Sequence, residues 1–276
     1  MAYFLKELGH RFSSSCKITR LHQHKNFRCC PFPQLQTKVA RGSQLCHNVM
    51  ANTNQFFPKS YNNQSLNGSA VPTLPSYADT SSHICAETLI NDMLVINDFI
   101  SETEEKLLLE EVEPYMARLR YEYTHWDDAI LGYRETERST WNAANTKIIN
   151  RLKDTAFDNV SSPTNYVHVL DLEENGEIKP HKDSIRYCGN TIAGISLLSD
   201  SVMRLVAIDN KELFIDVLLK QRSLYIMRQS ARYDYTHEIL HNDKSYFKEK
   251  HVKKGRRISV ICRNSPVVGD ERHKDS

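Results

Sequence analysis

The sequence predicts a domain of the α+β class, and three observations lead to that prediction. A capping box of Ser101 and Glu104 indicates the start of one helix. Apolar residues at helical spacing from Trp141 to Leu152 indicate a second helix. After Asn165 the chain changes to short β-rich runs, most of them separated by turn residues. Helices followed by a series of strands are typical of α+β domains whose strands form a sandwich or a barrel.

The expected elements follow one another along the chain. A short apolar strand at 93–96 precedes the first helix, whose first turn is acidic. Trp141 lies on the apolar face of the second helix, so we expect it to belong to the core rather than to a site. A tight turn is expected at Asn175-Gly176. The main strands are expected at 166–172, 191–198, 203–208, 213–219, 223–228 and 256–263.

Charge divides the chain into two parts that the average conceals. The net charge of the 276 residues is only +2. Residues 1–78 carry nine Lys or Arg and a single acid, Glu7, which gives +8, whereas residues 79–276 carry −6. No stretch approaches the roughly 18 consecutive apolar residues of a membrane helix, so no membrane span is predicted.

The basic N-terminal part is typical of a mitochondrial transit peptide, because it is weakly amphipathic, contains serine and is almost free of acids. Lys6 and Arg11 interrupt the apolar core that a secretory signal needs. A disordered basic tail that binds RNA or acidic surfaces is the alternative. We expect a transit peptide and disordered linker over 1–82, a folded domain over 83–268, and a flexible tail over 269–276. The expected destination is the mitochondrial matrix.

Cysteine usage favours a reducing compartment. Four of the seven cysteines lie in the basic leader, and Cys85, Cys188 and Cys262 are scattered through the rest. Three scattered cysteines provide neither a disulfide framework nor the spacing of a zinc site.

Histidine and aspartate two residues apart form the candidate metal motif. Such a pair on a strand points to one side, so it can supply two ligands of an iron site built from two histidines and a carboxylate. The last two of the four pairs lie too close to the C-terminal end for another histidine and strand to follow. Both other pairs have a histidine 56 residues further on and a later strand that carries arginine. The second is favoured because it comes just after a strand and the expected Asn175-Gly176 turn, and because its distant histidine, His237, lies beside an expected strand end. The pairs are His125-Asp127, His181-Asp183, His241-Asp243 and His273-Asp275.

The expected strand at 256–263 has one polar and one apolar face. Arg257, Ser259, Ile261 and Arg263 share a face by strand alternation. This face is either the solvent side of an edge strand or a pair of guanidinium groups that bind carboxylates. Tyr225, on an earlier strand, is either an ordinary buried tyrosine or a further hydrogen-bond donor to the same ligand.

Taken together, these residues resemble the AlkB-related branch of the Fe(II)- and 2-oxoglutarate-dependent dioxygenases. The likeness covers nearly all of 93–265 and none of the leader in detail. It implies a double-stranded β-helix, or jelly roll, flanked by N-terminal helices and with the metal at one mouth. The motifs that carry the likeness are His181-Lys182-Asp183, His237 and Arg257-x-Ser259-x-Ile261-x-Arg263.

The resemblance also implies the roles of the site residues and excludes His125-Asp127 as the metal pair. The Fe(2+) ligands it implies are His181, Asp183 and His237. The residues it implies for the cosubstrate 2-oxoglutarate are Tyr225, Arg257 and Arg263. No catalytic residue beyond the metal ligands is expected.

Two departures from the family pattern affect the expected cosubstrate pocket. The nucleic-acid-repairing relatives end with Arg-x-Asn-x-Thr-x-Arg, where this chain has Ser259 and Ile261. They also carry Asn-x-Tyr on the strand before the metal motif, whereas residues 168–172 read His-Val-Leu-Asp-Leu. Some contacts to 2-oxoglutarate are therefore expected to be replaced or lost.

The resemblance implies an enzyme that decarboxylates 2-oxoglutarate to succinate and CO2 with dioxygen while it hydroxylates a C–H bond. We expect a monomer that acts on a protein rather than a nucleic acid, because residues 79–276 are net acidic. The likeness is greatest to a mitochondrial member of the branch, which implies roles in alkylation-triggered necrosis and in fatty-acid handling.

Two alternatives stay open: a demethylase of mitochondrial RNA or DNA, and a metal-binding interaction module without turnover. The demethylase would use aromatic residues to stack on bases and a basic patch to contact phosphates. Each feature also has a structural interpretation, as a core-capping cluster and as a solvated loop. The aromatic residues are Tyr121, Tyr123, Trp126 and Tyr133, and the basic residues are Lys248, Lys250, Lys253, Lys254 and Arg256.

Overall fold

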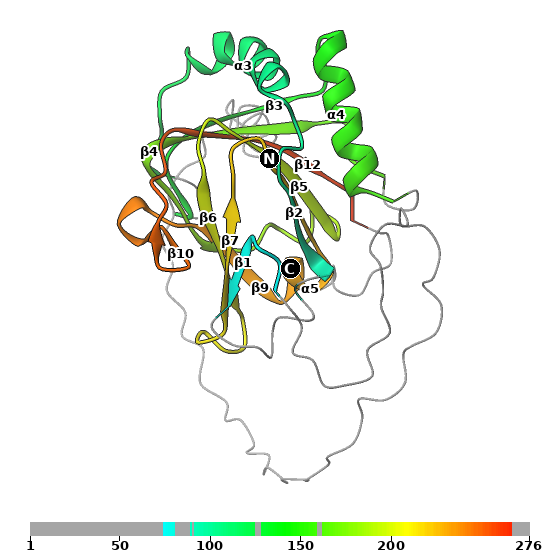
Figure 1. Cartoon of the computed structure of the whole chain (residues 1–276). Coiled ribbons are helices and arrows are strands. Elements are labelled where there is room, and N and C mark those ends of the chain that lie inside the picture. Colours follow the sequence, from blue (N-terminus) through cyan, green and yellow to red (C-terminus); the bar gives the residue numbers. More distant parts are fainter. Residues whose placement is uncertain (1–73, 81–88, 90, 125–127, 159–161, 267–276) are drawn as a thin grey trace, which may run out of the picture. The chain divides into compact units, whose positions relative to one another are not determined.

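Figure 1 shows a computed structural model of the chain, which describes residues 74–80, 89, 91–124, 128–158 and 162–266. Most of the expected leader and linker, and the expected C-terminal tail, lie outside the described residues. So do His125-Asp127 and His273-Asp275. None of the described helices is both long enough and apolar enough to cross a membrane.

Both long helices begin after a side-chain cap, and the sequence predicts the first of these caps. α3 (Glu102–Met116) begins after Ser101, whose hydroxyl accepts from the Glu104 amide while the Glu104 carboxylate accepts from the Ser101 amide. α4 (Ala143–Ala156) begins after Asn142, which caps it through its side chain. Two short helices follow later, α5 (Gln229–Tyr233) and the 3-10 helix η2 (Asn242–Lys244).

The strands are more numerous than the sequence predicts. The structure adds β1, β3, β9, β10 and β11, none of which the sequence analysis places as a strand. The bounds are β1 (Ala78–Thr80), β2 (Met93–Ile96), β3 (Ile130–Arg138), β4 (Val167–His181), β5 (Thr191–Leu197), β6 (Ser201–Ala207), β7 (Phe214–Leu219), β8 (Leu224–Arg228), β9 (Tyr235–Ile239), β10 (Tyr246–Phe247), β11 (Lys250–His251) and β12 (Arg257–Arg263).

All described strands except β10 and β11, which pair with each other, form two antiparallel layers that share β4. The larger layer has the order β3-β4-β12-β5-β8-β2, and the smaller has the order β4-β9-β6-β7-β1. After β4 the chain enters the larger layer at β5, the smaller at β6 and β7, the larger at β8, the smaller at β9 and the larger at β12. This alternation between two antiparallel layers is the jelly-roll arrangement, and it confirms the expected fold class.

β4 passes straight through Asn175-Gly176, so the tight turn predicted there is wrong. The first half of the strand pairs with β12 and β3, and its end pairs with β9 after a register shift. A Cβ atom on Gly176 would lie 2.6 Å from the carbonyl oxygen of Gly132 on β3. Glycine therefore permits a close approach of two strands where β4 crosses between the layers, instead of forming a hairpin turn.

Two apolar cores lie on the two faces of the larger layer. One fills the space between the layers, where Leu170, Leu172 and Ile261 meet side chains of the smaller layer such as Leu205 and Val217. The other lies between the outer face of the larger layer and helices α3 and α4, which Figure 1 shows on that side. Trp141 packs against this second core, as expected, but it precedes α4 instead of lying on it.

β12 is a central strand, which decides between the two interpretations of its polar face. It pairs with β4 on one side and β5 on the other. Its apolar residues Ile258 and Val260 face the helices, so Arg257 and Ser259 point into the space between the layers, where they are 2% and 1% exposed. The solvent-facing edge strand is therefore excluded, and the polar face belongs to the interior.

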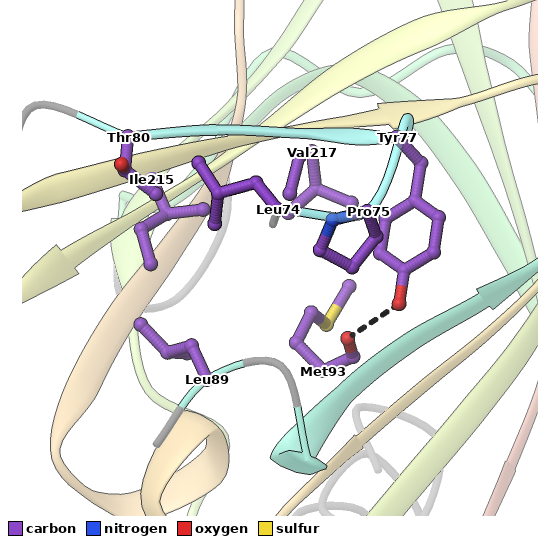
Figure 2. Close-up of a pocket in the computed structure, with 9 residues that line it drawn as sticks. Leu74, Pro75, Tyr77, Thr80, Leu89, Met93, Ile215 and Val217 are labelled. Atoms are coloured by element: carbon purple, nitrogen blue, oxygen red, sulfur yellow. Dashed lines mark hydrogen bonds between the residues drawn. The ribbon is translucent and has the colours of Figure 1, made fainter. Parts of the chain in front are cut away.

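Residues 74–80 fold onto the domain, so the linker predicted to reach 82 ends earlier. β1 pairs with the edge strand β7, and Ala78 is buried. Figure 2 shows Tyr77, whose hydroxyl donates to the carbonyl of Met93 at 3.4 Å. The segment, with Leu89, Met93 and β7, surrounds a small apolar pocket. The apolar side chains of this segment give it enough burial to add a strand to the sheet edge.

Candidate metal centre

His181, Asp183 and His237 come together at one mouth of the jelly roll. His181 ends β4 and is directly opposite His237 on β9, with 4.3 Å between the ring centroids. The Nε2 atoms of His181 and His237 lie 3.5 and 3.8 Å from Asp183 Oδ1. Within the described part of the chain, they are the one group of three such side chains with potential ligand atoms within 4.8 Å of one another.

The protonation states of His237 and Asp183 suit a divalent metal. His181 Nδ1 lies 2.9 Å from the carbonyl oxygen of Lys179, which can only accept, so Nδ1 carries a proton and Nε2 is the nitrogen that faces Asp183. Burial, with His181 adding to it, lowers the pKa of His237 to about 3. Burial acts to raise the pKa of Asp183, but the Arg263 guanidinium and the two histidines hold it well below its usual value. Neutral imidazoles and an ionised carboxylate are the forms that bind metal.

The other described His-x-Asp pair does not form such a centre. His241 Nδ1 and Asp243 Oδ1 lie 2.6 Å apart and bond to each other beyond the end of β9. Their side chains are 35% and 66% exposed. The pair is a surface contact and is not part of the cluster of His181, Asp183 and His237.

Arg257 lies on the inner wall of the barrel without an acidic partner among the described residues. Its Nε donates to Ser196 Oγ at 3.0 Å, and its Nη2 donates to Ser259 Oγ at 3.4 Å. A buried guanidinium whose partners are hydroxyl groups is costly unless an anion joins it. Arg257 is therefore a candidate for binding a carboxylate.

Tyr225 lies on the same inner wall, between the buried arginine and the metal residues. It is opposite Gly194 of β5, and a Cβ on Gly194 would lie 2.6 Å from Tyr225 Cε1, so the glycine makes room for the ring. Ser259 is a hydrogen-bond partner of its hydroxyl group. Burial raises the pKa of Tyr225, which therefore stays protonated and able to donate.

Arg263 lies at the metal end of β12 and already has two partners. Its Nε donates to Asp183 Oδ2 at 2.8 Å, and its Nη1 donates to His168 Nδ1 at 3.1 Å. Burial acts to lower the pKa of Arg263, but Asp183 outweighs it, so the net shift is upward. Its position beside the metal residues fits a role at that end, while Arg257 lies six residues further back along the strand.

The sequence analysis missed His168 and Glu135, which lie behind Arg263. His168 Nε2 lies 2.9 Å from Glu135 Oε2. The available signal was alternation, because His168 shares the inner face of β4 with Leu170 and Leu172. Without the position of β3, however, nothing in the sequence joins Glu135 to that face.

The described aromatic residues that were considered for base stacking differ in burial and in their partners. Tyr133 is buried in the core between the layers, and Tyr123 is exposed. Tyr121 lies under the guanidinium of Arg134 and donates to Asp171 Oδ1 at 3.2 Å. Trp126 lies outside the described residues.

The expected basic patch is also largely occupied by internal contacts. Lys254 is fully buried and its Nζ donates to the carbonyls of Glu173 and Glu174. Arg256 is bonded to the carboxylates of Glu113 and Asp171. The solvated-loop interpretation is therefore wrong for these two residues, and they are not available to phosphates.

A jelly roll with two histidines and a carboxylate at one mouth defines the class of non-haem iron oxygenases. A family model described as "2OG-Fe(II) oxygenase superfamily" matches residues 15–263, and the chain belongs to that superfamily. Its chemistry is that of a dioxygenase that uses Fe(II) and 2-oxoglutarate.

Two curated relatives carry the AlkB name that the sequence motifs predict. The chain is 52% identical over 178 residues to the mouse (Mus musculus) protein "Alpha-ketoglutarate-dependent dioxygenase alkB homolog 7, mitochondrial", covering 64% of this chain and 80% of that one. It is 54% identical over 168 residues to the bovine (Bos taurus) protein of the same name, covering 61% and 76%. A more distant relative, the "DNA N6-methyl adenine demethylase" of Caenorhabditis elegans, is 24% identical over 201 residues, covering 64% and 60%.

Proposed function

We propose that His181, Asp183 and His237 hold Fe(II) and that 2-oxoglutarate lies along the inner wall behind them. The observation that carries this proposal is the environment of Arg257, a guanidinium that is 2% exposed and bonded only to hydroxyl groups among the described residues. A dicarboxylate would provide the missing negative charge through a bidentate contact. Tyr225 and Ser259 would add hydroxyl groups on the same wall.

Iron held by these ligands would react with dioxygen and convert 2-oxoglutarate to succinate and CO2. The same reaction would be coupled to the hydroxylation of a C–H bond of the substrate. The residues of the chain prepare the site for that chemistry. Arg263 occupies Asp183 Oδ2 and leaves Oδ1 facing the two histidines. Leu170 and Leu172, buried opposite Ser259 and Arg257, form an apolar wall that excludes water.

Succinate formation tests the proposal directly. The full chain, supplied with Fe(II), 2-oxoglutarate and oxygen, should release succinate above the level of a His181→Ala variant. His241→Ala is the matched control, because it removes the histidine of a surface His-x-Asp pair, and it should retain wild-type turnover. Iron binding without succinate in the wild type, across protein and nucleic-acid substrates, would instead support the interaction module, which the lack of Asn-x-Tyr makes plausible.

We further propose a protein side chain as the substrate. Residues 79–276 are net −6, and Lys254 and Arg256 of the expected basic patch bond internally. A phosphate-binding surface usually has the opposite charge. The nematode relative named as a DNA demethylase supports the alternative.

Binding to single-stranded RNA and DNA across a salt series separates the two substrates. A protein hydroxylase should bind them weakly, with a shallow dependence on salt. Tight binding that weakens steeply as salt rises would favour the demethylase, because each neutralised phosphate releases counterions.

We propose that the enzyme works in the mitochondrion as a monomer. The mouse and bovine relatives are both named mitochondrial, and residues 1–78 carry a net charge of +8. Residues 1–78 fused to a fluorescent protein should direct it to mitochondria, and a diffuse signal would contradict the proposal. The matrix location and the roles in necrosis and fatty-acid handling stay predictions of the resemblance.

A further inference from the structure

Three neighbouring strands of the larger layer carry a chain of polar contacts that ends at the metal site. Glu135 on β3 bonds to His168 on β4 at 2.9 Å, and His168 bonds to Arg263 on β12 at 3.1 Å. Arg263 in turn bonds to Asp183 Oδ2 at 2.8 Å. The side chains of His168 and Glu135 are only 13% and 21% exposed, so water competes little for these bonds.

The two neighbours of His168 determine which of its nitrogen atoms carries the proton. An arginine N–H can only donate, so His168 Nδ1 must offer its lone pair to Arg263. An ionised carboxylate can only accept, so Nε2 carries the proton and donates to Glu135. Glu135 thereby fixes the tautomer that His168 needs in order to hold Arg263.

Arg263 is the link between this chain of contacts and the metal residues. By occupying Asp183 Oδ2, it leaves Oδ1 as the oxygen that faces His181 and His237. A guanidinium held by one bond only could rotate about its side-chain torsions, and Asp183 could then turn with it. The second bond, to His168, removes that freedom.

We infer that His168 is a positioning residue, which fixes the rotation of Arg263 and through it the carboxylate oxygen presented to the metal. The inference rests on the proposed function and deepens it by adding residues that support the metal site. One of them, Glu135, comes from β3, which lies outside the alternating strands of the jelly roll. Partners of this kind typically change metal affinity or activity by about 10–100-fold.

Three substitutions of His168 separate this role from a merely structural one. His168→Asn keeps an acceptor near the position of Nδ1 but does not reach Glu135. His168→Gln reaches towards Glu135 but leaves Arg263 without its acceptor. His168→Leu keeps an apolar body and removes both bonds. His241→Leu is the control, since it removes a surface histidine that bonds only to Asp243 among the contacts seen.

The readouts are Mn²⁺ affinity by calorimetry on the full chain, the KM for 2-oxoglutarate with iron present, and the melting temperature. His168→Leu and His168→Gln should weaken Mn²⁺ binding by about 10-fold or more, and His168→Asn should stay within about 3-fold of the wild type. The melting temperatures should not follow that order. The KM for 2-oxoglutarate should rise in the same two variants, because Arg263 lies beside the cosubstrate.

Equal Mn²⁺ affinity in all three variants, or affinities that simply follow melting temperature, would overturn the role of His168. The role would also be overturned if His168→Gln kept the Mn²⁺ affinity of the wild type while His168→Asn lost it. Each of these results is read against a wild type that produces succinate. A wild type that produces none overturns the proposed function itself, so the two failures are distinguishable.

Discussion

Arg257 gives the sharpest prediction at the level of a single residue. Arg257→Ala should raise the dissociation constant for 2-oxoglutarate by about 100-fold, because a desolvated charge pair is worth about 2–5 kcal/mol. Mn²⁺ affinity should change little, since the metal ligands lie at the other end of the pocket. Calorimetric titration of the metal-loaded full chain measures both constants.

The stability of Arg257→Ala without ligand provides a second test of the role of Arg257. Removing a buried guanidinium that lacks a carboxylate partner should leave the unfolding free energy nearly unchanged or higher. Arg151→Ala is the control, because Arg151 pairs with Glu104 at the surface and should not affect the cosubstrate. Unchanged 2-oxoglutarate affinity in Arg257→Ala would refute the assignment of Arg257.

Lys254 gives a prediction about pH. Burial, with Arg257 adding to it, lowers the pKa of Lys254 from 10.5 to about 8. Between these values the unfolded chain holds a proton at this residue that the folded chain has released, so the free energy of unfolding contributed by Lys254 rises with pH. The neutral amine still has two N–H groups for the carbonyls of Glu173 and Glu174.

Denaturant unfolding of the wild type and Lys254→Met at a series of pH values isolates this effect. The unfolding free energy of the wild type minus that of Lys254→Met should increase from about pH 8 upwards, by at most about 1.4 kcal/mol per pH unit. Other titrating groups largely cancel in the difference. A constant difference, or one that falls with pH, would contradict the buried, partly deprotonated lysine.

How far single residues could be predicted depends on how far apart their partners lie in the sequence. His181 and Asp183 stand two residues apart at the end of β4, and the resemblance supplied His237, so the sequence could bring the three together. His168 and Glu135 could not be joined, because 33 residues separate them and their contact depends on the pairing of β3 with β4. Long-range register of this kind is not visible in local patterns.

At the level of elements, the substitution Gly194→Ala, which adds one methyl group, tests the contact between β5 and β8. Gly194→Ala places a Cβ 2.6 Å from Tyr225 Cε1, and a ring held in a packed core cannot easily move away. We expect a loss of about 1–3 kcal/mol in unfolding free energy and weaker 2-oxoglutarate binding. Equilibrium unfolding and calorimetry measure the two effects.

Gly255→Ala is the matched control for that substitution. The nearest atom that its Cβ would meet is Ser199 Oγ at 3.7 Å, which is an ordinary contact. It should therefore leave both stability and cosubstrate binding close to wild type. Equal behaviour of the two alanine variants would show that Tyr225 is not held against Gly194.

The elements themselves were predicted unevenly for physical reasons. α3 and α4 have local caps, and the inner strands have continuous apolar runs, so both were predicted. β3 was missed because charged residues occupy both of its faces, and β9 because it is short and polar around His237. The Asn175-Gly176 turn failed because glycine is needed there for close strand approach, which local sequence cannot distinguish from a hairpin.

At the scale of the whole molecule, strand-rich composition predicted an α+β domain with a sandwich or barrel, and the family resemblance predicted the jelly roll. The order of strands within the two layers depends on pairings between distant segments, such as β4 with β12. The nearly neutral total charge conceals a basic leader and an acidic remainder. That division, together with the internal bonds of Lys254 and Arg256, favours a protein substrate over a nucleic acid.

A crystal structure of the chain with Mn²⁺ and 2-oxoglutarate, grown without oxygen, tests the central claim most directly. We predict an anomalous metal peak about 2.0–2.2 Å from His181 Nε2, an oxygen of Asp183 and His237 Nε2, as expected for nitrogen and oxygen ligands. One carboxylate of 2-oxoglutarate should reach the metal, and the other should contact Arg257. A metal peak elsewhere, or 2-oxoglutarate bound away from Arg257, would contradict the account.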